Sequence, residues 1–137
     1  MKNLLLLVVF LISGMSFAQD GVSVSGNTVS MREIPPTWPG CTGSELKKKN
    51  CFNQKLAQHI GKNFKFPKEY KAEDKGTKVI VTFIINEEGQ PEIKEITGGK
   101  PYLQEEAKRN ILQIPEMKPG MLGGKPRAIQ YKVPFNF

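Results

Sequence analysis

The chain has 137 residues, a formal net charge of +7 at pH 7 and two cysteines, and this length suits one domain rather than several. Beyond residue 18, no segment is long and apolar enough to cross a bilayer. The chain also lacks the aromatic-rich basic motif of RNA-binding domains, so we expect no nucleic-acid partner despite the positive charge.

Residues 1–18 have the layout of a secretory signal peptide. Lys2 gives a positive start, and an unbroken apolar run follows at residues 4–12. Ser16 and Ala18 are small residues at the −3 and −1 positions of a cleavage site. We therefore expect export and cleavage after Ala18. If the signal is retained instead, the same segment anchors the protein in the inner membrane.

Residues 19–38 are polar and lack a convincing period, so we expect a flexible tail ahead of a domain at 39–137. Cys41 and Cys51 remain after signal removal, and two thiols in an exported chain favour a structural disulfide. Their spacing is not the C-x-x-C of redox pairs. Together with the lone His59 they supply too few ligands for zinc, so we expect no metal site.

The first helix is predicted between Ser44 and Phe64, with Ser44 or Asn50 as its N-cap. One apolar stripe recurs along it at helical spacing: Phe52, Leu56, Ile60 and Phe64. Ten lysines fall between Lys47 and Lys78. They form either a solvated surface or a face that attracts an acidic partner, such as an anionic lipid head group or a cell-wall polymer.

Two strands and a second helix follow. Residues 77–85 are apolar on both faces, which predicts a central strand. Residues 91–96 return as a more polar strand after a short turn in which Gly89 can adopt a positive φ. Pro101 opens the next helix. The apolar stripe of that helix consists of Leu103, Ala107 and Ile111.

A loop at residues 117–126 and a last strand at 127–137 complete the order α-β-β-α-β. This order predicts an α+β fold, with a small three-stranded antiparallel sheet and two helices packed on one of its faces. The sequence contains no recognisable pair of catalytic carboxylates and no nucleophile beside a base, so we do not expect an enzyme.

Pro134 lies inside the last strand, where it cannot donate a ladder hydrogen bond. We expect its missing N–H to face away from the sheet, which makes this strand an edge. Because backbone groups alternate, Ala128, Gln130 and Lys132 would then present free N–H and C=O groups. Such an edge is either protected against aggregation by Lys132 and Pro134 or open to β-augmentation by a peptide. In the second case Arg127 and Lys132 would attract an acidic peptide, and the edge also permits a strand-paired homodimer.

Four short motifs stand in a distinctive order between Trp38 and Phe137. "WPGC" precedes the first helix and Phe66-Pro67 follows it. "GTKVIVTFIINEEGQPEIKEI" covers the hairpin, and "MKPGMLGGKPRAIQYKVPFNF" closes the chain. In this order they resemble the C-terminal domain of TonB-type energy transducers in its Bacteroidetes form, where Phe66-Pro67 takes the place of a Tyr-Pro motif.

The resemblance implies a periplasmic, non-enzymatic protein without a cofactor. Its implied partner is the Ton-box peptide of an outer-membrane TonB-dependent receptor, bound by strand addition and linked to transmembrane nutrient transport. Full transducers keep a membrane helix and a long spacer, so a cleaved signal here predicts an accessory or regulator of uptake. The alternative is a secreted cell-envelope adaptor or inhibitor that acts through the basic face between Lys47 and Lys78.

Overall fold

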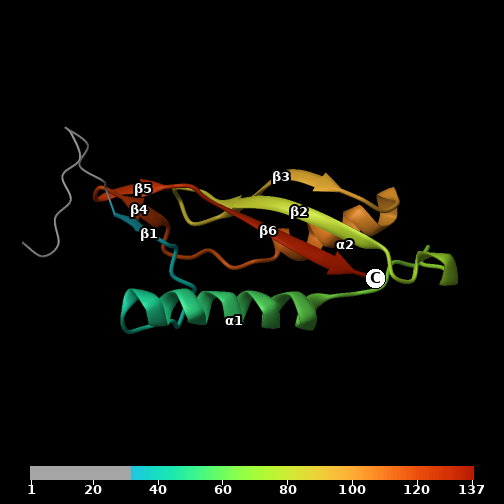
Figure 1. Ribbon diagram of the computed structural model, residues 1–137, viewed down its shortest axis with the longest axis horizontal. Coiled ribbons are helices and arrows are strands. Elements are labelled where there is room, and N and C mark those ends of the chain that lie inside the picture. The colour runs from blue at the N-terminus through green and yellow to red at the C-terminus, as the bar shows by residue number, and fades with distance from the viewer. Residues whose placement is uncertain (1–31) are drawn as a thin grey trace, which may run out of the picture. The chain divides into compact units, whose positions relative to one another are not determined.

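The computed structural model describes residues 32–137, and Figure 1 shows how their elements are arranged. The expected signal peptide and most of the expected tail lie outside the described residues. Within residues 32–137, no helix has the length and apolar character needed to cross a membrane. The elements are β1 (Glu33–Ile34), α1 (Glu45–Asn63), the 3-10 helix η1 (Ala72–Asp74), β2 (Lys78–Ile85), β3 (Pro91–Thr97), α2 (Pro101–Leu112), β4 (Gly120–Leu122), β5 (Lys125–Arg127) and β6 (Ile129–Asn136).

The main sheet contains three antiparallel strands in the order β3-β2-β6, with β2 in the centre. Along the β2–β6 pair, Lys78 lies opposite Asn136 and Ile85 lies opposite Ile129. The odd-numbered side chains of β2 are fully buried, because they face the two helices. These are Val79, Val81, Phe83 and Ile85. The predicted α+β class and the central position of β2 are confirmed.

The structure adds a second three-stranded antiparallel sheet, in the order β1-β4-β5, which the sequence pattern does not predict. Glu33 of β1 lies opposite Leu122 of β4, and β4 turns into β5 through Gly123 and Gly124, both with positive φ. The segment at 117–126, predicted as a loop, therefore contains most of a hairpin. Strands of two or three residues are too short to give a periodic signal in the sequence, so their pattern does not predict them.

The folded domain begins before the boundary predicted at Pro39. Ile34 lies in β1, and the Trp38 side chain is buried with its ring edge-on to Phe52, at a centroid distance of 5.7 Å. The sequence of this segment does not predict its structure, because its prolines and polar residues follow neither a helix period nor a strand period. The predicted disulfide between Cys41 and Cys51 forms just after it, with the two Cα atoms 5.9 Å apart.

Helix α1 is held against the edge strand of the main sheet. Its N-cap is Ser44, whose hydroxyl accepts a hydrogen bond from the Lys47 N–H at 3.3 Å. Phe52 is 2% exposed, and its ring stacks on Tyr131 of β6 at a centroid distance of 4.7 Å. Figure 1 shows α1 running beside β6 for much of its length. The predicted apolar stripe is confirmed at Phe52 and Leu56, which are both buried.

A buried carboxylate joins η1 to the start of α2. The Asp74 side chain is 2% exposed and accepts hydrogen bonds from the Tyr102 hydroxyl at 2.6 Å and from the Lys71 N–H at 2.9 Å. The Lys100 ammonium lies 3.1 Å from its other oxygen. The Tyr102 hydrogen bond is the main reason why the pKa of Asp74 is lowered.

We expect Asp74→Asn to flatten the acid limb of the stability profile. The stability that this carboxylate contributes is present above its ordinary pKa of 3.8 and is lost as the pH falls through the lower, folded pKa. Thermal unfolding recorded from about pH 6 to about pH 2 should show a smaller fall in Tm for the variant than for wild type. Glu116→Gln, which removes an exposed carboxylate, is the matched control. Parallel profiles for wild type and Asp74→Asn would contradict this role.

Candidate functional site

The outer side of β6 is an open sheet edge in the part of the chain that the structure describes. β6 pairs with β2 on one side, and no described strand pairs with it on the other. The Phe137 N–H donates to the Thr77 carbonyl at 3.0 Å, which sets the alternation along the strand. Pro134, three residues earlier and opposite Ile80, therefore falls on an outward position.

The same alternation places the backbone groups of Gln130 and Lys132 along the outer edge, as the proline argument predicts. Both side chains are exposed. Ala128 lies between β5 and β6 rather than in the last strand. Arg127 belongs to β5, and its Nε lies 3.4 Å from a Glu33 carboxylate oxygen, so its charge already has a partner. Two of the four predicted edge residues thus lie outside β6.

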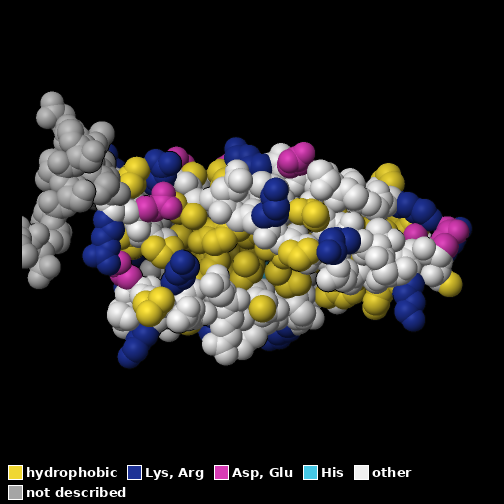
Figure 2. Space-filling view, viewed as in Figure 1, with side chains coloured by type: hydrophobic (Ala, Val, Ile, Leu, Met, Phe, Trp, Pro, Cys, Tyr) yellow, Lys and Arg dark blue, Asp and Glu magenta, His cyan; other side chains and the backbone are white. Residues whose placement is uncertain are grey.

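Two hollows lie between β6 and α1, one toward each end of the strand. Figure 2 shows apolar side chains gathered in a band over this region. The hollow at the end of β6 has a volume of about 300 Å³ and is lined by Ile60, Gly61, Phe64, Pro134, Phe135 and Asn136. The hollow at its start, of about 470 Å³, is lined by Arg32, Glu33, Pro35, Glu45, Leu46, Lys49, Ile129 and Tyr131. Two hollows therefore border β6. The one at the end of the strand is lined by uncharged residues, and the one at its start combines apolar and charged side chains.

The hollow at the start of β6 is lined by two carboxylates, Glu33 and Glu45, and two cations, Arg32 and Lys49, and lysines dominate α1 beyond Glu45. Residues 46–68 contain seven lysines and no acidic residue. Burial, with a smaller contribution from the Glu33 carboxylate, raises the pKa of Tyr131 to about 12. The Tyr131 ring is thus neutral at physiological pH, and it stacks on both Phe52 and Phe83. The arrangement suits an extended segment with apolar side chains and no excess of positive charge.

The Phe66-Pro67 motif lies apart from Gln130 and Lys132. Phe66 is 59% exposed and packs between Phe64 and Tyr70, with ring centroids 5.0 Å and 4.6 Å away. Phe64 in turn contacts Phe137, at 5.3 Å between centroids. These aromatic contacts tie the segment after α1 to the C-terminal end of the sheet, so the motif supports the end of β6 rather than its middle.

A buried polar cluster between α1 and α2 is absent from the sequence prediction. The Glu106 carboxylate accepts from the Lys65 N–H at 2.8 Å and pairs with Arg109 at 2.6 Å. The side-chain amide of Asn110, a fully buried residue, donates to the Ile60 carbonyl at 3.0 Å, and the main-chain carbonyl oxygen of Asn110 lies 2.9 Å from His59 Nε2. These bonds hold the two helices together. Polar residues next to the apolar stripe of α2 were the available signal.

Within residues 32–137, no three His, Cys, Asp or Glu side chains are grouped so that they could hold a metal ion. The described residues form a small α+β domain in which the open edge of β6 lies beside α1.

A family model described as Gram-negative bacterial TonB protein C-terminal matches residues 62–137, more than half of the chain. The protein belongs to the TonB C-terminal domain family. Domains of this family are non-enzymatic, periplasmic in Gram-negative bacteria, and serve TonB-like energy transduction and interaction with outer-membrane receptors in general. Comparisons with curated proteins and with solved structures give no significant match.

Proposed function

We propose that this protein is an exported, periplasmic module that binds the Ton-box segment of an outer-membrane TonB-dependent receptor and so takes part in nutrient transport. The segment adds to the main sheet as a fourth strand beside β6. The observation that carries the proposal is the outward position of Gln130, Lys132 and Pro134 on an open edge that two hollows border. Main-chain hydrogen bonds supply affinity in this mode, and pockets for alternate side chains supply specificity.

The edge also sets a limit on the length of the added strand. Gln130 and Lys132 each offer an N–H and a C=O, whereas Pro134 offers no N–H. Residues from the start of α1 and from β1 lie beside the other end of the strand, because they share a hollow with Ile129 and Tyr131. The bound segment is therefore short, and the alternate side chains that face α1 enter the two hollows.

A titration followed by NMR tests the proposal directly. The protein, isotopically labelled and with its disulfide intact, is mixed with Ton-box peptides from receptors of the same organism. We expect saturable shifts concentrated on the amides from Gln130 to Val133, because these groups line or border the new strand pair. Absence of shifts at millimolar peptide would overturn the proposal. A dilution series without peptide separates this result from self-pairing of two β6 edges.

A second candidate function, a cell-envelope adaptor acting through the lysines of α1, is favoured by the acid-free segment at residues 46–68. The same labelled sample distinguishes the two. Under the adaptor reading, an anionic envelope polymer shifts the amides of Lys47, Lys48 and Lys49, and replacing all three with glutamine abolishes association with the envelope. Retained association in that triple variant would exclude the adaptor.

A further inference from the structure

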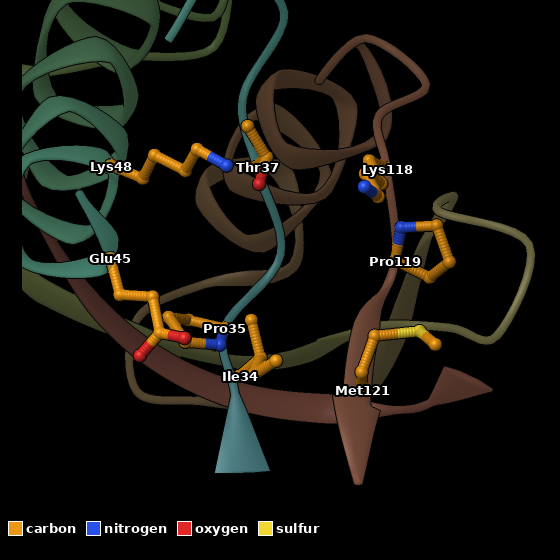
Figure 3. A pocket seen from close by; sticks show the side chains of 8 residues that line it. All are labelled: Ile34, Pro35, Thr37, Glu45, Lys48, Lys118, Pro119 and Met121. Atoms are coloured by element: carbon orange, nitrogen blue, oxygen red, sulfur yellow. The ribbon is translucent and has the colours of Figure 1, made fainter. Parts of the chain in front are cut away.

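A small cavity separate from the β6 edge lies between α1, β1 and the segment that leads into β4 (Figure 3). Its volume is about 160 Å³, below the range of about 300–1,000 Å³ that drug-sized ligands occupy. None of the residues that line it belongs to β6. The cavity is therefore suited to a small chemical group rather than to an extended peptide strand.

One part of the cavity is polar and positively charged. Thr37 and Lys118 lie opposite each other in an isolated antiparallel bridge, in which the Thr37 N–H donates to the Lys118 carbonyl at 3.0 Å. Directly opposed residues project their side chains on the same face. Lys48 enters from α1, and Figure 3 shows its amine pointing toward Thr37. Thr37, Lys48 and Lys118 thus line the same small space, with Lys48 half-buried and Lys118 exposed.

The two lysines have no charged partner among residues 32–137. The ion pairs formed there involve neither Lys48 nor Lys118. Lys48 is also half-buried, whereas its neighbours Lys47 and Lys49 are exposed. A half-buried amine across a cavity from a second amine provides a favourable place for one anionic group.

The remaining lining limits what can accompany that anion. Ile34, Pro35, Pro119 and Met121 contribute apolar surface. Glu45 also lines the cavity, and its carboxylate is paired with Arg32. A second negative charge in the ligand would meet the Glu45 carboxylate, so the cavity favours a monoanion with an apolar body over a multiply charged ion.

We propose that this cavity binds a small carboxylate carried on a short aliphatic body. The carboxylate lies against Lys48, Thr37 and Lys118, and the aliphatic part packs on the prolines and Met121. Two sources share this chemistry: a free branched short-chain acid, and the C-terminus of a peptide that ends in an aliphatic residue. The cavity contains no residue of β6, and it shares only Pro35 and Glu45 with the hollow at the start of that strand.

The test is an NMR titration of the labelled full chain at constant ionic strength, with isovalerate, N-acetyl-leucine and inorganic phosphate as separate probes. We expect saturable shifts at Thr37, Lys48 and Lys118 with a carboxylate probe and at least about tenfold weaker binding of phosphate. Preference for isovalerate identifies a free acid as the ligand type, and preference for N-acetyl-leucine identifies a peptide C-terminus.

Substitutions make the assignment specific. Lys48→Met and Lys118→Met keep most of the side-chain stem, and each should weaken the favoured carboxylate about tenfold, the loss expected for one charge-assisted hydrogen bond. Lys55→Met removes an exposed lysine on the same helix that does not line the cavity, and it should change nothing. Equal binding of phosphate, an equal effect of Lys55→Met, or no saturable shift with either carboxylate would each overturn the proposal.

Discussion

Gly89→Ala is expected to lower the free energy of unfolding by at least about 4 kcal/mol, at the upper end of single-substitution effects. Gly89 has a φ of +81° in the turn between β2 and β3, and its N–H donates to the Asn86 carbonyl at 2.9 Å. Its own carbonyl accepts from the Met117 N–H at 3.0 Å. An added Cβ would overlap the backbone carbonyl oxygen of Met117, and no side-chain rotation can relieve a clash with backbone.

Chemical denaturation of the purified variants measures this loss. Gly76→Ala is the matched control, because Gly76 has a φ of +86° and no heavy atom lies within 4 Å of the position of its added Cβ. That control carries only the strain of a left-handed alanine, about 1–2 kcal/mol. Equal losses in the two variants would show that the Gly89–Met117 contact is not what makes Gly89 necessary.

The turn illustrates what local sequence can and cannot predict. The five-residue connection around Gly89 predicts a positive φ there, and the structure confirms it. The docking of this turn on Met117 depends on a segment 28 positions further along the chain, for which the sequence carries no local signal. For the same reason the sequence does not predict the pairing of Glu33 with Leu122. The long apolar alternation of β2, in contrast, predicts that strand directly.

In the candidate site, too, local sequence predicts some features and misses those that depend on distant segments. One proline at position 134 predicts which backbone groups of β6 point outward, because alternation along a strand is strict. Alternation cannot show where the strand begins, and the β4–β5 hairpin places Arg127 and Ala128 outside it. The cavity beside Thr37 joins three segments that are far apart in the sequence. Lys48 and Lys118, which form no ion pair within residues 32–137, therefore become neighbours only in the folded domain.

Replacing an outward N–H of β6 gives the sharpest test of strand addition. We expect Gln130→Pro to weaken binding of a Ton-box peptide at least about tenfold, because it removes one main-chain donor and places a ring on the path of the added strand. The free energy of unfolding should change by no more than about 1 kcal/mol, because this N–H does not bond to β2 and Pro134 already occupies an equivalent position.

Gln130→Ala is the matched control, since it removes the side chain and keeps the donor. Peptide affinity measured by calorimetry should remain near wild type in the alanine variant and fall in the proline variant, because affinity in strand addition comes from the backbone. A similar loss in both variants would assign the contact to the Gln130 side chain. Undiminished binding in Gln130→Pro, with the fold intact, would move the peptide away from β6 altogether and leave the basic face of α1 as the surface to probe.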